Sequence, residues 1–305
     1  MLQMINILFS PIALIALGFY LFQSKTLDEK FWNGAEKLNY YVLFPSLLFS
    51  SLASANMHMG NIDTILLVIF TMILLIIVST YLFAKLNKTP FSQFGVYIQG
   101  LIRFNTYIGL SIATTLQNPD IKSILVNILA IVIPFVNVVS IISLTPKNHL
   151  NFKHIFISLI KNPLISSCLI GIAFNFLHIP IWSGFQNLLQ AFSNSSLMLG
   201  LLCVGTAIQL KGIQTYLKTA LLMSCTRLVI IPIITFIILQ FFQLHYAAII
   251  AIMIFFSIPT ASASYILTKL LHGDYQLMAA VISLQTILSV FTLAIMLSLV
   301  QAYYS

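Results

Sequence analysis

Apolar runs of about 20 residues, bounded by short polar or Gly- and Pro-containing segments, follow one another along the whole chain. A run of this length crosses a hydrocarbon core of about 30 Å as one α-helix. The runs and their boundaries predict ten membrane-spanning helices. They cover residues 4–22, 33–55, 62–87, 91–117, 119–144, 156–178, 181–208, 214–240, 245–271 and 275–302. We therefore expect an all-α integral membrane protein.

The lysines between the runs indicate how the chain is oriented. With the N-terminus outside, the outer loops carry only Lys122, and the inner loops carry Lys25, Lys30, Lys85, Lys88, Lys147, Lys153, Lys161, Lys211, Lys218 and Lys269. Because positive residues collect in cytoplasmic loops, this pattern predicts a multi-pass protein of the cytoplasmic (inner) membrane with both termini extracytoplasmic. No Lys or Arg precedes Lys25, so we interpret 4–22 as a retained span rather than a signal peptide.

The longest connection between the runs divides the ten predicted spans into five and five. Features recur across it at an offset of about 150 residues: Trp32 and Gly34 open one span, and Trp182 and Gly184 open another. Because five is odd, the second half enters the membrane from the opposite side, an inverted repeat that is typical of secondary transporters. We expect a first five-helix repeat over 1–144, a cytoplasmic linker over 145–155 and a second repeat over 156–305.

Composition agrees with this class and excludes others. Hydrophobic residues make up 60% of the chain and charged residues 7%, whereas a soluble domain has about 25% charged residues. The net charge of +8 comes from lysines that stand singly, so we expect the lipid bilayer and no nucleic acid as partner. The cysteines and histidines lack metal-ligand spacing, and no catalytic motif is present, so we expect no metal, no cofactor and no enzyme.

Two predicted spans are interrupted at corresponding depths. Asn105 and Gly109 lie in 91–117, and Pro259 lies in 245–271, 154 residues after Asn105. Proline removes a backbone donor, and Asn and Gly tolerate unwound backbone. The N–H groups freed at the start of a half-helix favour an anion, so we expect the substrate site here. The alternative is that Pro259 is a simple helix kink.

The two arginines, Arg103 and Arg227, both lie within predicted spans, where a charge costs at least about 2.5–3.5 kcal/mol. No Asp or Glu lies deep in any predicted span. An arginine without a carboxylate partner is a candidate receptor for a substrate carboxylate. The alternative is that each arginine caps helix carbonyls or reaches toward the headgroups. The missing carboxylates disfavour cation/proton exchange, and uniport stays open because the membrane potential alone drives anion export.

Several segments, taken in order, resemble the auxin efflux carrier family over essentially the whole chain, and within it the bacterial malonate permeases. They are Pro11 to Gly18, NYYVLFPSLLF (39–49), RFNTYIGL (103–110), LLCVGTAIQL (201–210), RLVIIP (227–232) and SIPTASASYILTKLLHGD (257–274). The resemblance implies two inverted five-helix repeats, with the fourth and ninth helices broken and crossing, as in sodium/proton antiporters or bile-acid symporters. It also implies a homodimer.

On the matching positions, the resemblance implies that Asn105 contacts substrate, that Pro259 is the crossover proline and that Pro45 lines the facing side. The chain lacks the long central loop of the plant exporters, and its fourth span has no crossover proline. We therefore expect a small mono- or dicarboxylate, such as malonate or malate. The candidate substrate-binding residues are Arg103, Asn105, Thr106, Tyr107, Gly109, Pro259, Thr260, Ser262 and Pro45, with Arg227, Gln99, Asn137 and Gln285 as secondary candidates.

Two other functions stay open. A sodium-coupled organic anion symporter would use polar mid-span groups such as Gln99, Asn137 and Gln285 as ligands, although no acidic companion is present. A membrane receptor or scaffold would leave the paired interruptions and the buried arginines unexplained.

Overall fold

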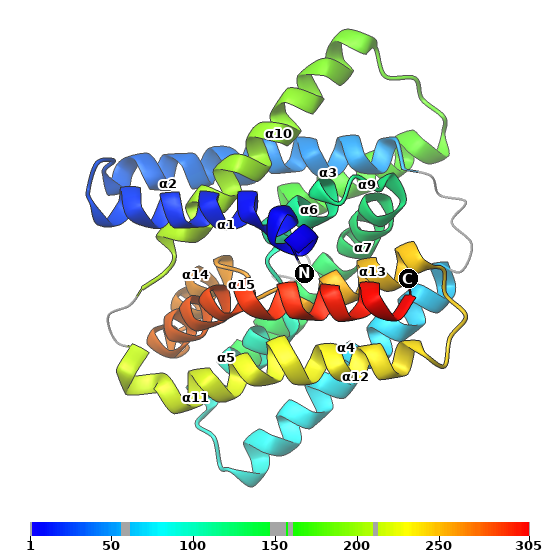
Figure 1. Cartoon of the computed structure of the whole chain (residues 1–305). Helices are drawn as coiled ribbons and strands as arrows, with labels where there is room; N and C mark the ends of the chain where they lie inside the picture. The colour runs from blue at the N-terminus through cyan, green and yellow to red at the C-terminus, as the bar shows by residue number, and fades with distance from the viewer. Residues whose placement is uncertain (1, 56–61, 147–156, 158–160, 210–212, 305) are drawn as a thin grey trace.

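The computed structural model describes residues 2–55, 62–146, 157, 161–209 and 213–304, and all regular secondary structure in these ranges is helical (Figure 1). The first half contains α1 (Leu2–Gln23), α2 (Glu29–Leu38), η1 (Asn39–Leu43), α3 (Phe44–Ala53), α4 (Ile62–Leu86), α5 (Phe91–Ile102), α6 (Thr106–Thr115) and α7 (Pro119–Leu144). The second half contains α9 (Pro163–Phe176), α10 (Ser183–Thr206), α11 (Ile213–Cys225), η3 (Thr226–Ile230), α12 (Ile231–Leu239), α13 (Tyr246–Ser257), α14 (Ala263–Leu270) and α15 (Tyr275–Tyr304).

Among the described residues, six helices are long and apolar enough to cross a membrane, which supports a membrane location. They cover Asn6–Gln23, Ile62–Leu86, Pro119–Leu144, Ser183–Thr206, Ile213–Leu239 and Tyr275–Tyr304. The other predicted spans correspond to helices that are shorter or interrupted: α2 with η1 and α3, α5 with α6, α9, and α13 with α14. The count of ten spans therefore stays a prediction. So does the division at 145–155, most of which lies outside the described residues.

The helices pack as two groups. The first group is α1, α2, η1, α3, α9 and α10, and the second comprises α4 to α7 and α11 to α15 with η3. In Figure 1 the first group lies above, and most of the second group lies below. α1, α3, α9 and α10 touch the second group mainly through α6, α7 and α15. Each group is thus a packed unit with a shared face between them.

Small and polar residues join the helices of the first group. A side chain on Gly18 would collide with the carbonyl of Leu202, so α1 and α10 approach to backbone contact. The buried Asn39 amide donates to the Ser196 carbonyl at 3.2 Å, and the Ser196 hydroxyl donates back to Asn39 Oδ1 at 2.7 Å. Asn39 opens the π-turn η1, which interrupts the regular helix at this buried contact.

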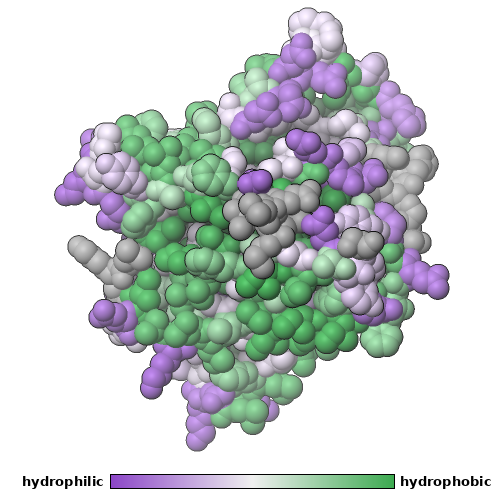
Figure 2. Space-filling view, in the orientation of Figure 1, coloured by the Kyte–Doolittle hydropathy of each residue, from purple (hydrophilic) through white to green (hydrophobic). Residues whose placement is uncertain are grey.

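The second group contains the most deeply buried helix, α13, whose side chains are buried from Ala247 to Ser257. On the surface of the molecule, α4 exposes large apolar side chains such as Leu67, Leu74 and Leu82. Figure 2 shows a broad apolar face over α1, α12 and α15, with hydrophilic residues gathered toward the helix ends. An apolar face of this breadth on a folded chain is suited to lipid rather than to water.

Candidate functional site

Two helix interruptions meet in the second group. α5 ends before Arg103, whose backbone is extended (φ −73°, ψ 157°), and α13 ends before Ile258, which has nearly the same conformation (φ −74°, ψ 148°). The Asn105 N–H donates to the Pro259 carbonyl at 2.8 Å, so the two extended segments lie against each other. We call this contact, formed by residues 103–105 and 258–262, the crossing.

Four half-helix ends converge on the crossing, with two polarities. α5 and α13 bring their C-terminal carbonyls, whereas α6 and α14 begin there with N–H groups that have no partner within the helix. Each N-terminus carries about half a positive charge, and each C-terminus about half a negative charge. The side chain of Asn105 caps α6 by accepting from the Ile108 N–H at 3.2 Å. Because the N-termini of α6 and α14 lie close together, their N–H groups favour an anion between them.

A cavity of about 350 Å³ opens beside the crossing, between the two helix groups. The second group supplies the residues at the starts of both half-helices: Asn105, Thr106 and Tyr107 before and in α6, and Ala261, Ser262 and Ala263 before and in α14. Both positive half-helix ends therefore face the cavity. Such a volume lies within the range of small-molecule binding sites.

Arg103 is the one arginine that lines this cavity, and most of its donors are unused by the protein. Its Nη1 donates to Gln99 Oε1 at 3.3 Å, whereas a guanidinium has five N–H donors. No Asp or Glu of the described residues lines the cavity. The site thus combines a cation and two positive helix ends without a lining carboxylate, and this distribution of charge favours an anion as ligand.

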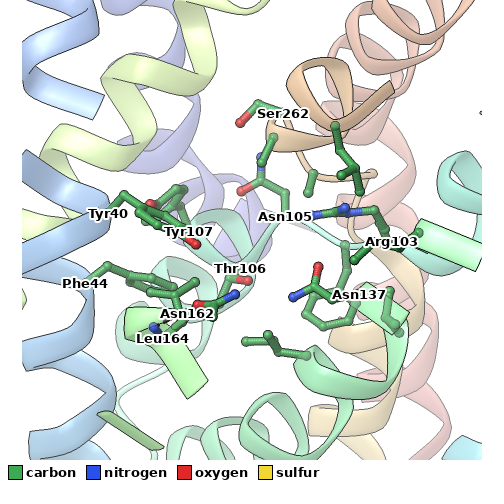
Figure 3. Close-up of a pocket in the computed structure, with 17 residues that line it drawn as sticks. Tyr40, Phe44, Arg103, Asn105, Thr106, Tyr107, Asn137, Asn162, Leu164 and Ser262 are labelled. Carbon is green, nitrogen blue, oxygen red and sulfur yellow. Dashed lines mark hydrogen bonds between the residues drawn. The ribbon is translucent and has the colours of Figure 1, made fainter. Parts of the chain in front are cut away.

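The opposite wall comes from the first group. Tyr40 and Phe44 project from η1 and α3, and Asn162 and Leu164 from the start of α9 (Figure 3). The Tyr107 ring packs on Phe44 with centroids 4.8 Å apart, and it also lies against Gly200, where a larger residue would collide with it. None of these four wall residues is among the candidates predicted from the sequence. Their position depends on how the two helix groups dock.

The structure brings six of the candidate residues to the cavity: Arg103, Asn105, Thr106, Tyr107, Ser262 and, among the secondary candidates, Asn137 (Figure 3). The others do not line it. Pro259 and Thr260 are buried in the crossing, Gly109 packs on Ile258, and Pro45 follows Phe44 in α3 without lining the cavity. Gln99, Gln285 and Arg227 are buried behind the crossing, where each bonds to the backbone or to other side chains.

A family model described as the Sodium Bile acid symporter family matches residues 194–305, which contain the second half of α10 and everything that follows it. No curated protein matches the chain significantly. The assignment to the auxin efflux carrier family is wrong, because the matching model describes a distinct family. The resemblance rested on short, mostly apolar strings, and such strings are weak evidence for one family because apolar residues recur in every membrane helix. The match supports a membrane transporter of the sodium-coupled organic anion type.

Proposed function

We propose that this chain is a secondary transporter that carries a small organic anion across the cytoplasmic membrane. The observation that carries the proposal is the convergence of Arg103 and the starts of α6 and α14 on one cavity without a carboxylate. An anion of malonate or malate size, with one or two negative charges, suits a cation flanked by two half-positive helix ends. One carboxylate would bind Arg103, and a second group would face Thr106 and Ser262.

The placement of the cavity between two helix groups supports alternating access. The cavity reaches the end of α7 and the start of α9, which the lysine pattern assigns to the cytoplasmic side. At the other end of the contact between α3 and α7 lies a second cavity of about 270 Å³, lined by Ser50, Ser54, Asp120 and Lys122 among others. Sliding one group against the other would close the first cavity and widen the second. Ten spans, extracytoplasmic termini and a homodimer belong to the same proposal.

Uptake into proteoliposomes tests this function. Labelled malonate or malate should accumulate in liposomes that contain the wild-type protein, and excess unlabelled acid should abolish the signal. A neutral analogue, such as the malonate diester, should neither compete nor accumulate by this route. Absence of saturable uptake of any small carboxylate, by protein that is folded and correctly inserted, would reject an anion carrier.

Sodium coupling is the second candidate, and the family match is the observation that favours it. In this version each anion enters with one or more sodium ions. The two versions separate in one assay, because a sodium gradient imposed at zero membrane potential accelerates uptake only in the symporter. Replacing external sodium by choline then abolishes the accumulation.

A further inference from the structure

Arg227 is a fully buried cation that lies beside the crossing and outside the cavity. It stands in η3 with 0% of its surface exposed. All three of its hydrogen bonds go to backbone carbonyls: Nη1 donates to Leu101 at 2.9 Å, Nη2 to Phe255 at 3.1 Å and Nε to Ile258 at 3.0 Å. In the described part of the chain, no hydrogen bond joins it to a carboxylate. Its charge is therefore balanced by helix ends alone.

The three carbonyls belong to the two half-helices that end at the crossing. Leu101 is in the last turn of α5, Phe255 is in the last turn of α13, and Ile258 is the C-cap of α13. Carbonyls in these positions have no intrahelical partner, and each helix end carries about half a negative charge. Two ends sum to about one negative charge, which a single guanidinium neutralises. Arg227 thus matches the crossing in charge and in geometry.

In broken-helix transporters, unwound carbonyls and half-helix C-termini are where a coupling cation is held. At this crossing the neighbouring oxygens already have donors. The Gln99 carbonyl accepts from Thr260 Oγ1 at 3.0 Å, and the Gly100 carbonyl accepts from Gln285 Nε2 at 3.0 Å. The Gln285 Oε1 accepts from the Thr260 N–H at 2.9 Å, and the Gln99 Oε1 accepts from Arg103. A sodium ion does not fit there, because it would displace these donors beside two guanidinium groups.

The local helix geometry also serves this arrangement. The five residues Thr226–Ile230 form a π-turn within an otherwise continuous helical stretch, Ile213–Leu239. A π-turn inserts one residue into the helix and so redirects the side chains around it. Here Arg227 points to the crossing, while Thr226 is half-buried and its hydroxyl donates to the Leu222 carbonyl of its own helix at 2.8 Å.

We propose that Arg227 is the resident cation of the crossing. It holds the carbonyl ends of α5 and α13 where a bound sodium ion would otherwise be needed, so that the anion binds beside Arg103 without sodium at the crossing. The sodium-independent binding of the anion rests on the proposed transport function, whereas the role of Arg227 as resident cation does not. Arg227 is a positioning residue, because it contacts the half-helices and not the substrate.

Thermal unfolding of the purified full-length protein in lipid nanodiscs tests the resident cation without any substrate. Arg227→Met, Arg227→Lys and wild type are compared in equal millimolar choline, sodium and guanidinium chloride. Lys218→Gln is the matched control, since it removes an exposed cation from the same helical stretch. Wild type and control should unfold at one midpoint in all three salts.

Arg227→Met should unfold on the order of 10 °C lower in choline, and sodium or guanidinium should restore part of the loss by entering the emptied position. The midpoint of Arg227→Lys should lie between those of wild type and Arg227→Met, because lysine keeps the charge and lacks the planar guanidinium. A wild-type midpoint for Arg227→Met, or equal stabilisation of wild type and Arg227→Met by sodium, would overturn the proposal. If Arg227→Met does not fold, the lysine variant decides, and its failure to fold would overturn the proposal as well.

Malonate binding tests whether the anion binds without sodium at the crossing. The dissociation constant of wild type should agree within about twofold between sodium and choline, while that of Arg227→Met should weaken in choline and recover in guanidinium. If the dissociation constant of wild type differed tenfold or more between sodium and choline, sodium-independent binding would be overturned. If wild type binds no malonate in either salt, the proposed substrate fails, and the unfolding midpoints still decide the role of Arg227.

Discussion

Replacing Arg103 by methionine should weaken anion binding by about 30- to 150-fold. Its guanidinium makes one long hydrogen bond to the protein, 3.3 Å to Gln99, so four of its five N–H groups remain for a ligand. Hydrogen bonds to charged groups contribute about 1.5–3 kcal/mol. Losing a two-pronged carboxylate contact at a half-buried site therefore costs about 2–3 kcal/mol, and each 1.4 kcal/mol is a factor of ten. Arg103→Lys keeps the charge but cannot make a two-pronged contact, so its affinity for the anion should fall about tenfold.

Calorimetric titration of malonate, with uptake measured in parallel, checks these values. The thermal midpoint of Arg103→Met should stay near that of wild type, since one long hydrogen bond is lost, and this separates Arg103 from Arg227. Lys269→Gln, which removes an exposed cation at the end of α14, is the control and should bind as wild type does. Wild-type affinity in folded Arg103→Met would refute the placement of the anion.

Three further predictions concern the scaffold and the orientation. Gly18→Leu should lower the unfolding midpoint because the side chain would collide with the Leu202 carbonyl, whereas Gly34→Ala, with open space around it, should not. Asn39→Leu and Ser196→Ala should each destabilise the protein by about 1–3 kcal/mol in denaturation experiments, and the double variant by less than the sum. Peptide tags at both termini should be cleaved by protease added to spheroplasts, whose outer membrane is open, and a protected tag at either end would contradict the orientation drawn from the lysines.

The helical architecture and the location of the crossing were predictable from local properties of the chain. Apolar length indicates which segments form membrane helices, and proline or asparagine at mid-span indicates where a helix is interrupted. Asn105 was paired with Pro259 because the distance between them in the sequence matches the offset between the two predicted repeats. In the structure, a backbone hydrogen bond of 2.8 Å joins the two residues. Such signals report on one segment at a time, or on two segments that repeat one pattern.

The opposite wall of the cavity was not predictable in this way. Tyr40 and Phe44 sit in an apolar run where nothing local separates cavity-facing from lipid-facing positions, and Asn162 has the pattern of an ordinary helix cap. They reach the cavity because α3 and α9 pack together and then meet α7. The family assignment failed for a related reason, since short strings within apolar helices carry little information about which transporter family they belong to.

The two arginines had the same description in the sequence, a lone cation inside an apolar run, and the structure gives them opposite surroundings. Arg227 donates to three carbonyls at the negative ends of α5 and α13, and it is fully buried outside the cavity, so it does not face a ligand there. Arg103 stands on the other side of the crossing, among the positive ends of α6 and α14, with most of its donors unused. Because the negative ends are already neutralised within the protein, the uncompensated charge of the crossing is positive and faces the cavity. This distribution of charge favours an anion as ligand, and the crossing needs no additional cation because Arg227 already neutralises its negative ends.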